Sequence, residues 1–169
     1  MRLVRPLVAL CLCLCLAALA CTVAPAGAAT TASPAQVSDA KLEGVRQAKP
    51  RLTLSVAARE GAGLTNITVE VGVALDVAQQ KRTLAAGIVL RSASGSKLKF
   101  TATSTPGTIR IRLLSPQPSV NLKIGVPALA TTPKLLDHIR EGRTRKLGLV
   151  VGTRETGGKG TRLPLIVAV

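Results

Sequence analysis

Apolar and polar residues alternate through most of the chain from Arg51 onward. A period of two residues is typical of β-strands that bury one face and expose the other. The alternating segments are 52–56, 67–73, 98–102, 109–113, 120–126, 147–151 and 163–169, and a more uniformly apolar run covers 88–90. The same alternation places Val73 and Val126 on the buried side, together with the apolar residues that precede them.

Glycine-containing turns fall between these segments and predict hairpins. The turn pairs are Ser94-Gly95, Pro106-Gly107 and Gly157-Gly158. A two-residue loop at 106–107 predicts four cross-strand pairs: Ala102 with Ile111, Phe100 with Leu113, Thr103 with Arg110, and Thr101 with Arg112. One face of this hairpin is then apolar and the other polar, so the turn and the alternation predict the same register.

One helix is predicted before the last hairpin. Thr132 is a suitable N-cap, Pro133 fits the first helical position, and Gly142 can end the helix. Its core-facing residues are expected to be Leu135, Leu136 and Ile139. Residues 39–49 could hold a further short helical turn. Together these elements predict an all-β fold, a two-sheet antiparallel sandwich with one short helix, and a small barrel is the alternative.

The N-terminal segment differs from the rest of the chain. Arg2 and Arg5 precede an unbroken apolar run over residues 7–20, and the small residues Ala26-Gly27-Ala28 follow. This order is typical of a cleavable signal peptide, and the run is too short for a membrane span. We therefore expect a signal peptide at 1–28, a flexible linker at 29–50 and one folded domain at 51–169, with no transmembrane span in the mature chain.

All four cysteines lie before the expected cleavage site. The mature domain would then hold no disulfide and no cysteine-based metal site. Cys21 follows Ala18-Leu19-Ala20, which loosely matches a bacterial lipobox, so the alternative to a secreted or envelope-associated protein is a lipid anchor at Cys21.

The charge of the chain is strongly positive. Its formal net charge is +15, which favours anionic partners. A possible polyanion-binding surface comprises Arg91, Lys97, Lys99, Arg110, Arg112 and Lys123. Lys97, Lys99, Arg110 and Arg112 are expected on the outward face of one hairpin, joined by the other two from neighbouring strands. The alternative is that these charges only keep the face solvated and prevent edge aggregation.

Three stretches of the pattern resemble a known group of domains. They are LTLSVAARE, GSKLKFTATSTPGTIRIRLL and KLGLVVGTRETGGKGTRLPLIVAV, with the ATTPKLLDHI insertion before the last. The chain from Arg51 to Val169 is similar to the immunoglobulin-like sandwich domains of secreted and surface proteins from high-GC bacteria. The resemblance implies a binding, adhesion or spacer role. The Cys…Trp…Cys core of antibody domains is missing from the sequence.

Catalytic chemistry has no visible basis in the sequence. The single histidine, His138, follows Asp137 on the expected helix, the acids are scattered, and no Gly-x-Ser-x-Gly motif occurs. We therefore predict no catalytic, cofactor-binding or metal-binding residues, no cofactor and no small-molecule substrate. Phe100 is the only aromatic residue, which disfavours nucleic acid as a partner because single-strand binders use aromatic platforms.

The functional hypothesis is a secreted, non-enzymatic cell-envelope module with a binding or structural role. Its partner would be an anionic envelope polymer or a surface protein. One alternative is a basic protein that binds wall polymer or acidic lipid. A second is a secreted enzyme or inhibitor that uses loops without a recognisable motif.

Overall fold

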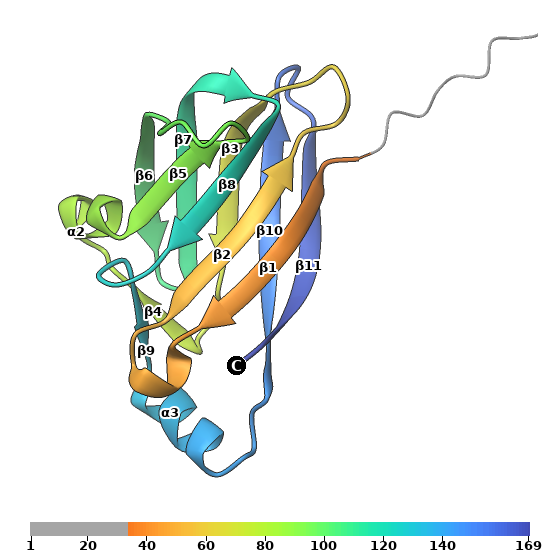
Figure 1. The fold of residues 1–169 in the computed structure, drawn as a ribbon. Helices are drawn as coiled ribbons and strands as arrows, with labels where there is room; N and C mark the ends of the chain where they lie inside the picture. Colours follow the sequence, from red (N-terminus) through yellow and green to blue (C-terminus); the bar gives the residue numbers. More distant parts are fainter. Residues whose placement is uncertain (1–33) are drawn as a thin grey trace, which may run out of the picture. The chain divides into compact units, whose positions relative to one another are not determined.

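The alternating segments form two antiparallel sheets that lie face to face in the computed structural model, which describes residues 34–169 (Figure 1). Sheet A has the order β1 (Gln36–Glu43), β2 (Arg51–Ala57), β8 (Ser119–Ile124), β5 (Ile88–Ser92). Sheet B has the order β11 (Gly160–Ala168), β10 (Lys146–Glu155), β3 (Leu64–Glu70), β7 (Thr108–Gln117), β6 (Phe100–Thr105). A short pair, β4 (Leu75–Val77) and β9 (Leu129–Thr131), completes the strands.

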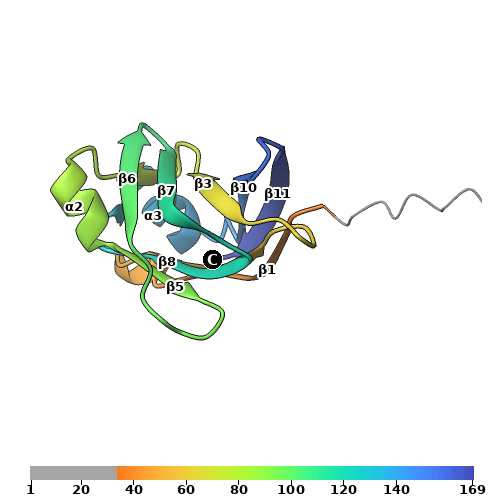
Figure 2. The same cartoon turned by 90° about the horizontal axis from the view of Figure 1, so that it is seen from above.

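The strand order is that of an immunoglobulin-like sandwich. The order β1-β2-β8-β5 corresponds to the four-stranded A-B-E-D sheet, and β11-β10-β3 corresponds to G-F-C. The β6–β7 hairpin extends the second sheet beside β3. Seen from above, the two sheets form two layers (Figure 2). The fold is therefore the predicted all-β sandwich rather than the small barrel.

The space between the layers is filled by aliphatic side chains. The largest fully buried ones are Leu52, Leu64, Ile67, Leu75, Leu84, Leu90, Ile109, Ile111, Leu122, Ile124, Leu129 and Leu149. Each contributes roughly 1.5–3 kcal/mol through burial of its apolar surface. Phe100 lies only partly buried at the margin of this cluster.

The β6–β7 hairpin has the predicted register. Thr105 and Thr108 form its last pair, so Pro106 and Gly107 are a two-residue loop. Ala102 lies opposite Ile111 on the core side, and Thr103 lies opposite Arg110 on the outer side, as the pattern indicated.

Two apolar residues expected in the core are exposed. β3 ends at Glu70, and Gly72 has a φ of 64°, so the chain turns and leaves Val73 97% exposed. β8 ends at Ile124, and Val126 lies in the turn that follows, 56% exposed. In both segments the alternation continues in the sequence beyond the last strand pair, so the pattern alone does not show where the strand ends.

The turn at Ser94-Gly95 does not close a hairpin within one sheet. A single bridge joins Arg91 to Lys97 across it, and the chain then crosses from β5 in sheet A to β6 in sheet B. The turn residues match the prediction, but the two strands they separate belong to different layers.

The predicted helix is α3 (Pro133–Arg140). Thr132 caps it, because its hydroxyl oxygen accepts a hydrogen bond from the Leu135 N–H at 3.3 Å. Leu135 and Ile139 are buried, whereas Leu136 is only half-buried. A second helix, α2 (Lys81–Ala86), was not predicted; it contacts β5 and β6 and has no side-chain cap that would mark its start in the sequence. The short helical turn that residues 39–49 could hold is η1 (Val45–Gln47).

Strand β1 lies in the segment that was expected to be a flexible linker. It lies within residues 29–50 and pairs with β2 along its length, so the prediction of a flexible linker is wrong for Gln36–Glu43. Its alternation is hard to recognise because the register shifts between Ser38 and Lys41, where Asp39 has a φ of 54°. The expected signal peptide and Cys21 lie outside the described residues. None of the helices in the described part of the chain is long and apolar enough to cross a membrane.

A close backbone approach at Gly87 provides a test of the packing between the end of α2 and the turn that joins β8 to β9. A Cβ at this position would lie 2.3 Å from the Ala128 nitrogen and 2.5 Å from the Gly125 oxygen. Gly87→Ala should therefore lower the free energy of unfolding by about 1–3 kcal/mol, the usual cost of overpacking. Gly148→Ala is the matched control, since nothing lies within 4 Å of its Cβ. Urea unfolding of both variants measures the difference, and equal stabilities would contradict the close approach.

Candidate anion-binding groove

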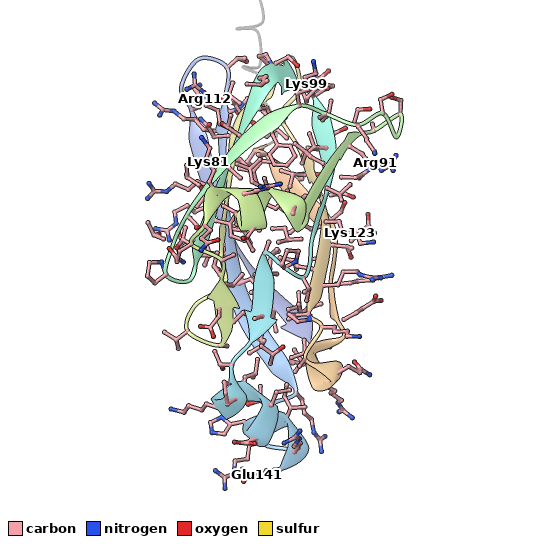
Figure 3. All side chains as sticks on the ribbon, turned by 90° about the vertical axis from the view of Figure 1, so that its left-hand side faces the viewer. Lys81, Arg91, Lys99, Arg112, Lys123 and Glu141 are labelled. Carbon is pink, nitrogen blue, oxygen red and sulfur yellow. The ribbon has the colours of Figure 1, made fainter. Side chains whose placement is uncertain are left out.

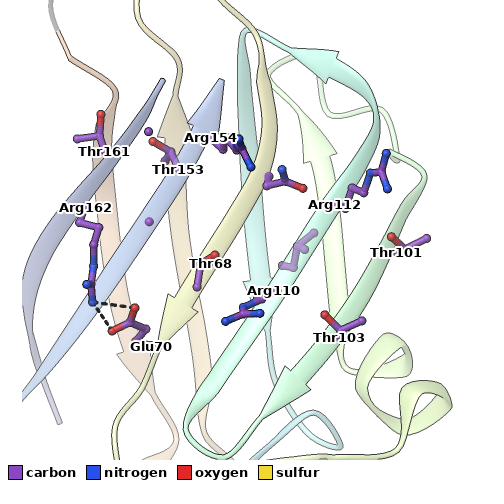
Figure 4. A pocket seen from close by; sticks show the side chains of 14 residues that line it. Thr68, Glu70, Thr101, Thr103, Arg110, Arg112, Thr153, Arg154, Thr161 and Arg162 are labelled. Carbon is purple, nitrogen blue, oxygen red and sulfur yellow. Dashed lines mark hydrogen bonds and ion pairs between the residues drawn. The ribbon is translucent and has the colours of Figure 1, made fainter. Parts of the chain in front are cut away.

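The outer face of sheet B is hollowed into an open groove of about 740 Å³ (Figure 4). All five strands of the sheet contribute to its lining. The outward side chains alternate with the buried ones, so the groove is built from the residues that the core does not use.

Strand register arranges the lining in two rows across the sheet. The first row reads Thr101, Arg112, Asn66, Arg154, Gly160, from β6 to β11. The second row reads Thr103, Arg110, Thr68, Gly152, Arg162. Neighbouring strands lie about 4.8 Å apart and successive outward residues about 7 Å apart. Arg112 and Arg154 are therefore separated by about two strand spacings, and Arg110 and Arg112 by one step along β7.

Three of the four groove arginines have no carboxylate partner among residues 34–169. Arg110, Arg112 and Arg154 form no ion pair in this part of the chain. Arg162 instead donates two hydrogen bonds to Glu70, at 2.8 and 2.7 Å (Figure 4). Glu70 is the one acidic residue in the described lining, so the groove keeps an excess of positive charge.

Gly152 leaves the space for the Glu70–Arg162 pair. Arg162 lies on β11 and Glu70 on β3, with β10 between them. Gly152 is the β10 partner of Arg162, and a Cβ there would lie 4.0 Å from the Arg162 Cγ and 3.5 Å from the Thr68 Cβ. Because Gly152 has no side chain, the arginine can cross β10 and reach the carboxylate.

Neutral polar side chains separate the arginines. Asn66, Thr68, Thr101 and Thr103 lie between or beside them in the two rows, and within residues 34–169 none of these side chains makes a hydrogen bond. Hydroxyl and amide groups both donate and accept hydrogen bonds. The groove therefore combines fixed cations with uncommitted hydrogen-bonding groups, and it contains no aromatic residue.

The predicted basic surface is divided by the fold. Arg110 and Arg112 lie in the groove, whereas Lys97 and Lys99 precede β6, which begins at Phe100, and do not line the groove. Arg91 and Lys123 project from sheet A on the opposite side of the sandwich (Figure 3). The six residues therefore do not form one surface.

Arg154 and Arg162 were missed because they come from distant strands. Both occupy outward positions next to alternating segments, which was a usable signal for their orientation. Their place beside Arg110 and Arg112 depends on the pairing of β3 with both β7 and β10, which no turn in the sequence specifies.

A buried ion pair fixes one end of the groove. Glu155, the last residue of β10, accepts hydrogen bonds from the backbone N–H of Arg59 at 2.8 Å and from its Nε at 2.5 Å. Burial raises the pKa of the Glu155 carboxyl, but the hydrogen bonds from Arg59 and the charges of Arg59 and Lys159 outweigh this effect, so the pKa lies below its ordinary value. The pair ties the loop between β2 and β3 to the strand end beside Arg154.

Other chemistry is sparse in the described chain. His138 lies half-buried on α3. Across residues 34–169 no group of three or more histidine, cysteine, aspartate or glutamate side chains could hold a metal ion.

No family model and no curated protein matches this chain. Among solved structures, it is similar to a DUF4466 family protein from Parabacteroides merdae, with a TM-score of 0.45 and 12% identity, covering 79% of this chain and 44% of that one. It is also similar to ACE19, the collagen binding subdomain of the Enterococcus faecalis surface protein ACE, with a TM-score of 0.40 and 7% identity. This likeness covers 72% of the present chain and 87% of ACE19. The chain thus spans less than half the length of the first. Likenesses at this level say nothing about what the present chain binds.

The Glu155–Arg59 pair generates a pH-dependent prediction. Since the pKa of Glu155 is lower in the folded state than in the unfolded state, the pair contributes its full stability above the ordinary pKa of 4.5 and loses it as the pH falls through the folded-state value. At pH 7, Glu155→Gln should lower the free energy of unfolding by about 2 kcal/mol, the usual cost of breaking a buried charged hydrogen bond. The difference from wild type should shrink in urea titrations at acidic pH.

Glu141→Gln is the control for this measurement. Glu141 pairs with Arg143 at 2.9 Å, but both side chains are largely exposed. Such a surface pair contributes about 0–1 kcal/mol. A Glu155→Gln effect that stays constant down to pH 3 would contradict the assigned protonation.

Proposed function

We propose that the chain is a secreted, non-enzymatic binding module of the cell envelope, and that the sheet B groove holds a linear anionic polymer. The observation that carries the proposal is the set of three arginines without carboxylate partners on a floor of threonine and asparagine. Arginine binds phosphate, sulfate and carboxylate groups through paired N–H donors. The signal-peptide pattern over residues 1–28 supports export, and Cys21 would add a lipid anchor if it were processed.

The shape of the site favours a polymer over a membrane surface. A strand-like polymer can lie in a hollow of about 740 Å³ and meet arginines separated by one or two strand spacings. A bilayer surface is better met by protruding basic and apolar side chains. The neutral donors between the arginines further favour a polymer that carries hydroxyl groups between its anionic groups, such as an acidic polysaccharide or a polyol phosphate.

An enzymatic role has little support from the acids near the groove. Glu70 is engaged by Arg162, and Glu155 is buried against Arg59. The pKa of Glu155 is lowered, which keeps it charged and unsuited to donate a proton at neutral pH. A binding role uses the same groups without requiring either of them to react.

Neutralising the three arginines tests the proposal. The triple variant Arg110→Gln, Arg112→Gln, Arg154→Gln should bind a heparin oligosaccharide at least about tenfold more weakly, since each charge-assisted hydrogen bond contributes roughly 1.5–3 kcal/mol. The matched control removes three exposed charges elsewhere: Lys81→Gln, Arg82→Gln and Lys134→Gln on α2 and α3. Calorimetry at low salt measures both. Equal weakening in both variants would mean that net charge alone governs binding.

Removing the groove carboxylate should have the opposite effect. Glu70→Gln abolishes a negative charge in the lining and releases Arg162, so the affinity for the same oligosaccharide should rise severalfold at low salt and the gain should fade as salt screens the charges. Asp137→Asn is the control, because it breaks an exposed ion pair with Arg140 on α3, outside the groove. Unchanged or weaker binding by the Glu70→Gln variant would show that Arg162 and Glu70 do not face the ligand.

A further inference from the structure

The outer face of sheet A carries a second basic surface of similar composition. Register places Lys41, Thr53, Lys123 and Val89 in one row across β1, β2, β8 and β5. The next row contains Ser55, Asn121 and Arg91. A hollow of about 370 Å³ lies over these residues. Three cations thus surround a floor of small hydroxyl and amide side chains, as they do on sheet B.

The cations of this face are free to meet a ligand. Among residues 34–169, Lys41, Arg91 and Lys123 form no ion pair. Arg91 donates one hydrogen bond to the Gly95 carbonyl at 2.7 Å, which holds its guanidinium near the surface of β5. Asp39 borders the hollow from the edge strand β1, where it accepts a hydrogen bond from Ser38. One carboxylate against three cations leaves this face positive.

The two basic faces point in opposite directions. Alternation along the strands sends the outward residues of each sheet away from the shared core, and stacked sheets lie about 10 Å apart. Arg112 projects from one side of the sandwich, whereas Arg91 and Lys123 project from the other (Figure 3). One flat surface cannot contact both faces at the same time, but two separate polymer chains can.

We propose that the domain binds two chains of anionic polymer, one on each sheet, and thereby crosslinks them. This inference rests on the proposed function of the sheet B groove and adds a second, independent surface. Charge complementarity selects the occupant of sheet A. The Ser55 hydroxyl donates a hydrogen bond to Asn121 Oδ1 at 2.8 Å, which leaves the Asn121 amide N–H groups and the Thr53 hydroxyl as hydrogen-bonding groups between the cations. The role of the module would then be to hold neighbouring polymer chains together.

A two-step capture experiment tests crosslinking. The purified exported protein is bound to immobilised heparin, washed, and then offered fluorescent heparin in solution. Native mass spectrometry with a heparin octasaccharide counts the oligosaccharides bound to each protein molecule. Four proteins are compared: wild type, the sheet B triple variant, the control triple variant on α2 and α3, and a sheet A triple variant with Lys41→Gln, Arg91→Gln and Lys123→Gln.

Crosslinking requires that wild type and the α2/α3 control bind two octasaccharides and capture fluorescent heparin. Each single-face variant should bind one octasaccharide and lose most of the captured fluorescence. If wild type binds one octasaccharide and only the sheet B variant loses it, the second surface is refuted and the proposed function stands. If the sheet B variant binds as wild type does, the proposed function fails. Binding to anionic lipid vesicles without binding to heparin would overturn the choice of a polymer on both faces.

Discussion

Burial of aliphatic side chains between two sheets is the interaction on which the rest of the molecule depends. The described domain contains no cysteine, and its single aromatic residue lies at the margin of the core. Buried leucine, isoleucine and valine side chains from eight of the nine strands of the two sheets, with Ala102 from β6, must therefore supply the stabilisation. This requirement places alternate residues of each strand in the interior. The remaining residues face outward and do not contribute to the packing between the sheets. The charged and hydroxyl-bearing residues of both outer faces occupy these outward positions.

Two polar contacts of the described residues join separate parts of the fold. Glu155 is buried and pairs with the partly exposed Arg59, and together they connect the β2–β3 loop to the end of β10. Thr132 joins the start of α3 to the segment before β4 through a hydrogen bond to the Ala74 carbonyl. A buried carboxylate is stable only when its oxygens accept hydrogen bonds, and the two bonds from Arg59 meet this condition for Glu155. These polar contacts anchor loops at defined positions, whereas burial of the aliphatic core holds the two sheets together.

Local signals in the sequence were sufficient for much of the fold and for half of the groove arginines. The two-residue loop at Pro106-Gly107 determined the register of β6 and β7, and the cap at Thr132 determined the start of α3. β1 was not predicted because its register shifts between Ser38 and Lys41. The inward residues Val37 and Leu42 therefore do not follow one continuous period of two. The groove could not be assembled from the sequence, because the neighbours of β7 and β10 across β3 are set by packing between segments far apart in the chain.

The row arrangement on sheet B has a consequence for how such a surface can change during evolution. A one-residue shift of β7 against β3 would turn Ile109 and Ile111 outward and destroy the core. A two-residue shift would preserve the inward and outward alternation, yet it would move Arg110 and Arg112 by about 7 Å relative to Arg154. Substitutions at outward positions are equally independent of the interior. The spacing of the cations, and with it the preferred repeat of a bound polymer, can therefore diverge among descendants of this domain while the sandwich itself stays the same.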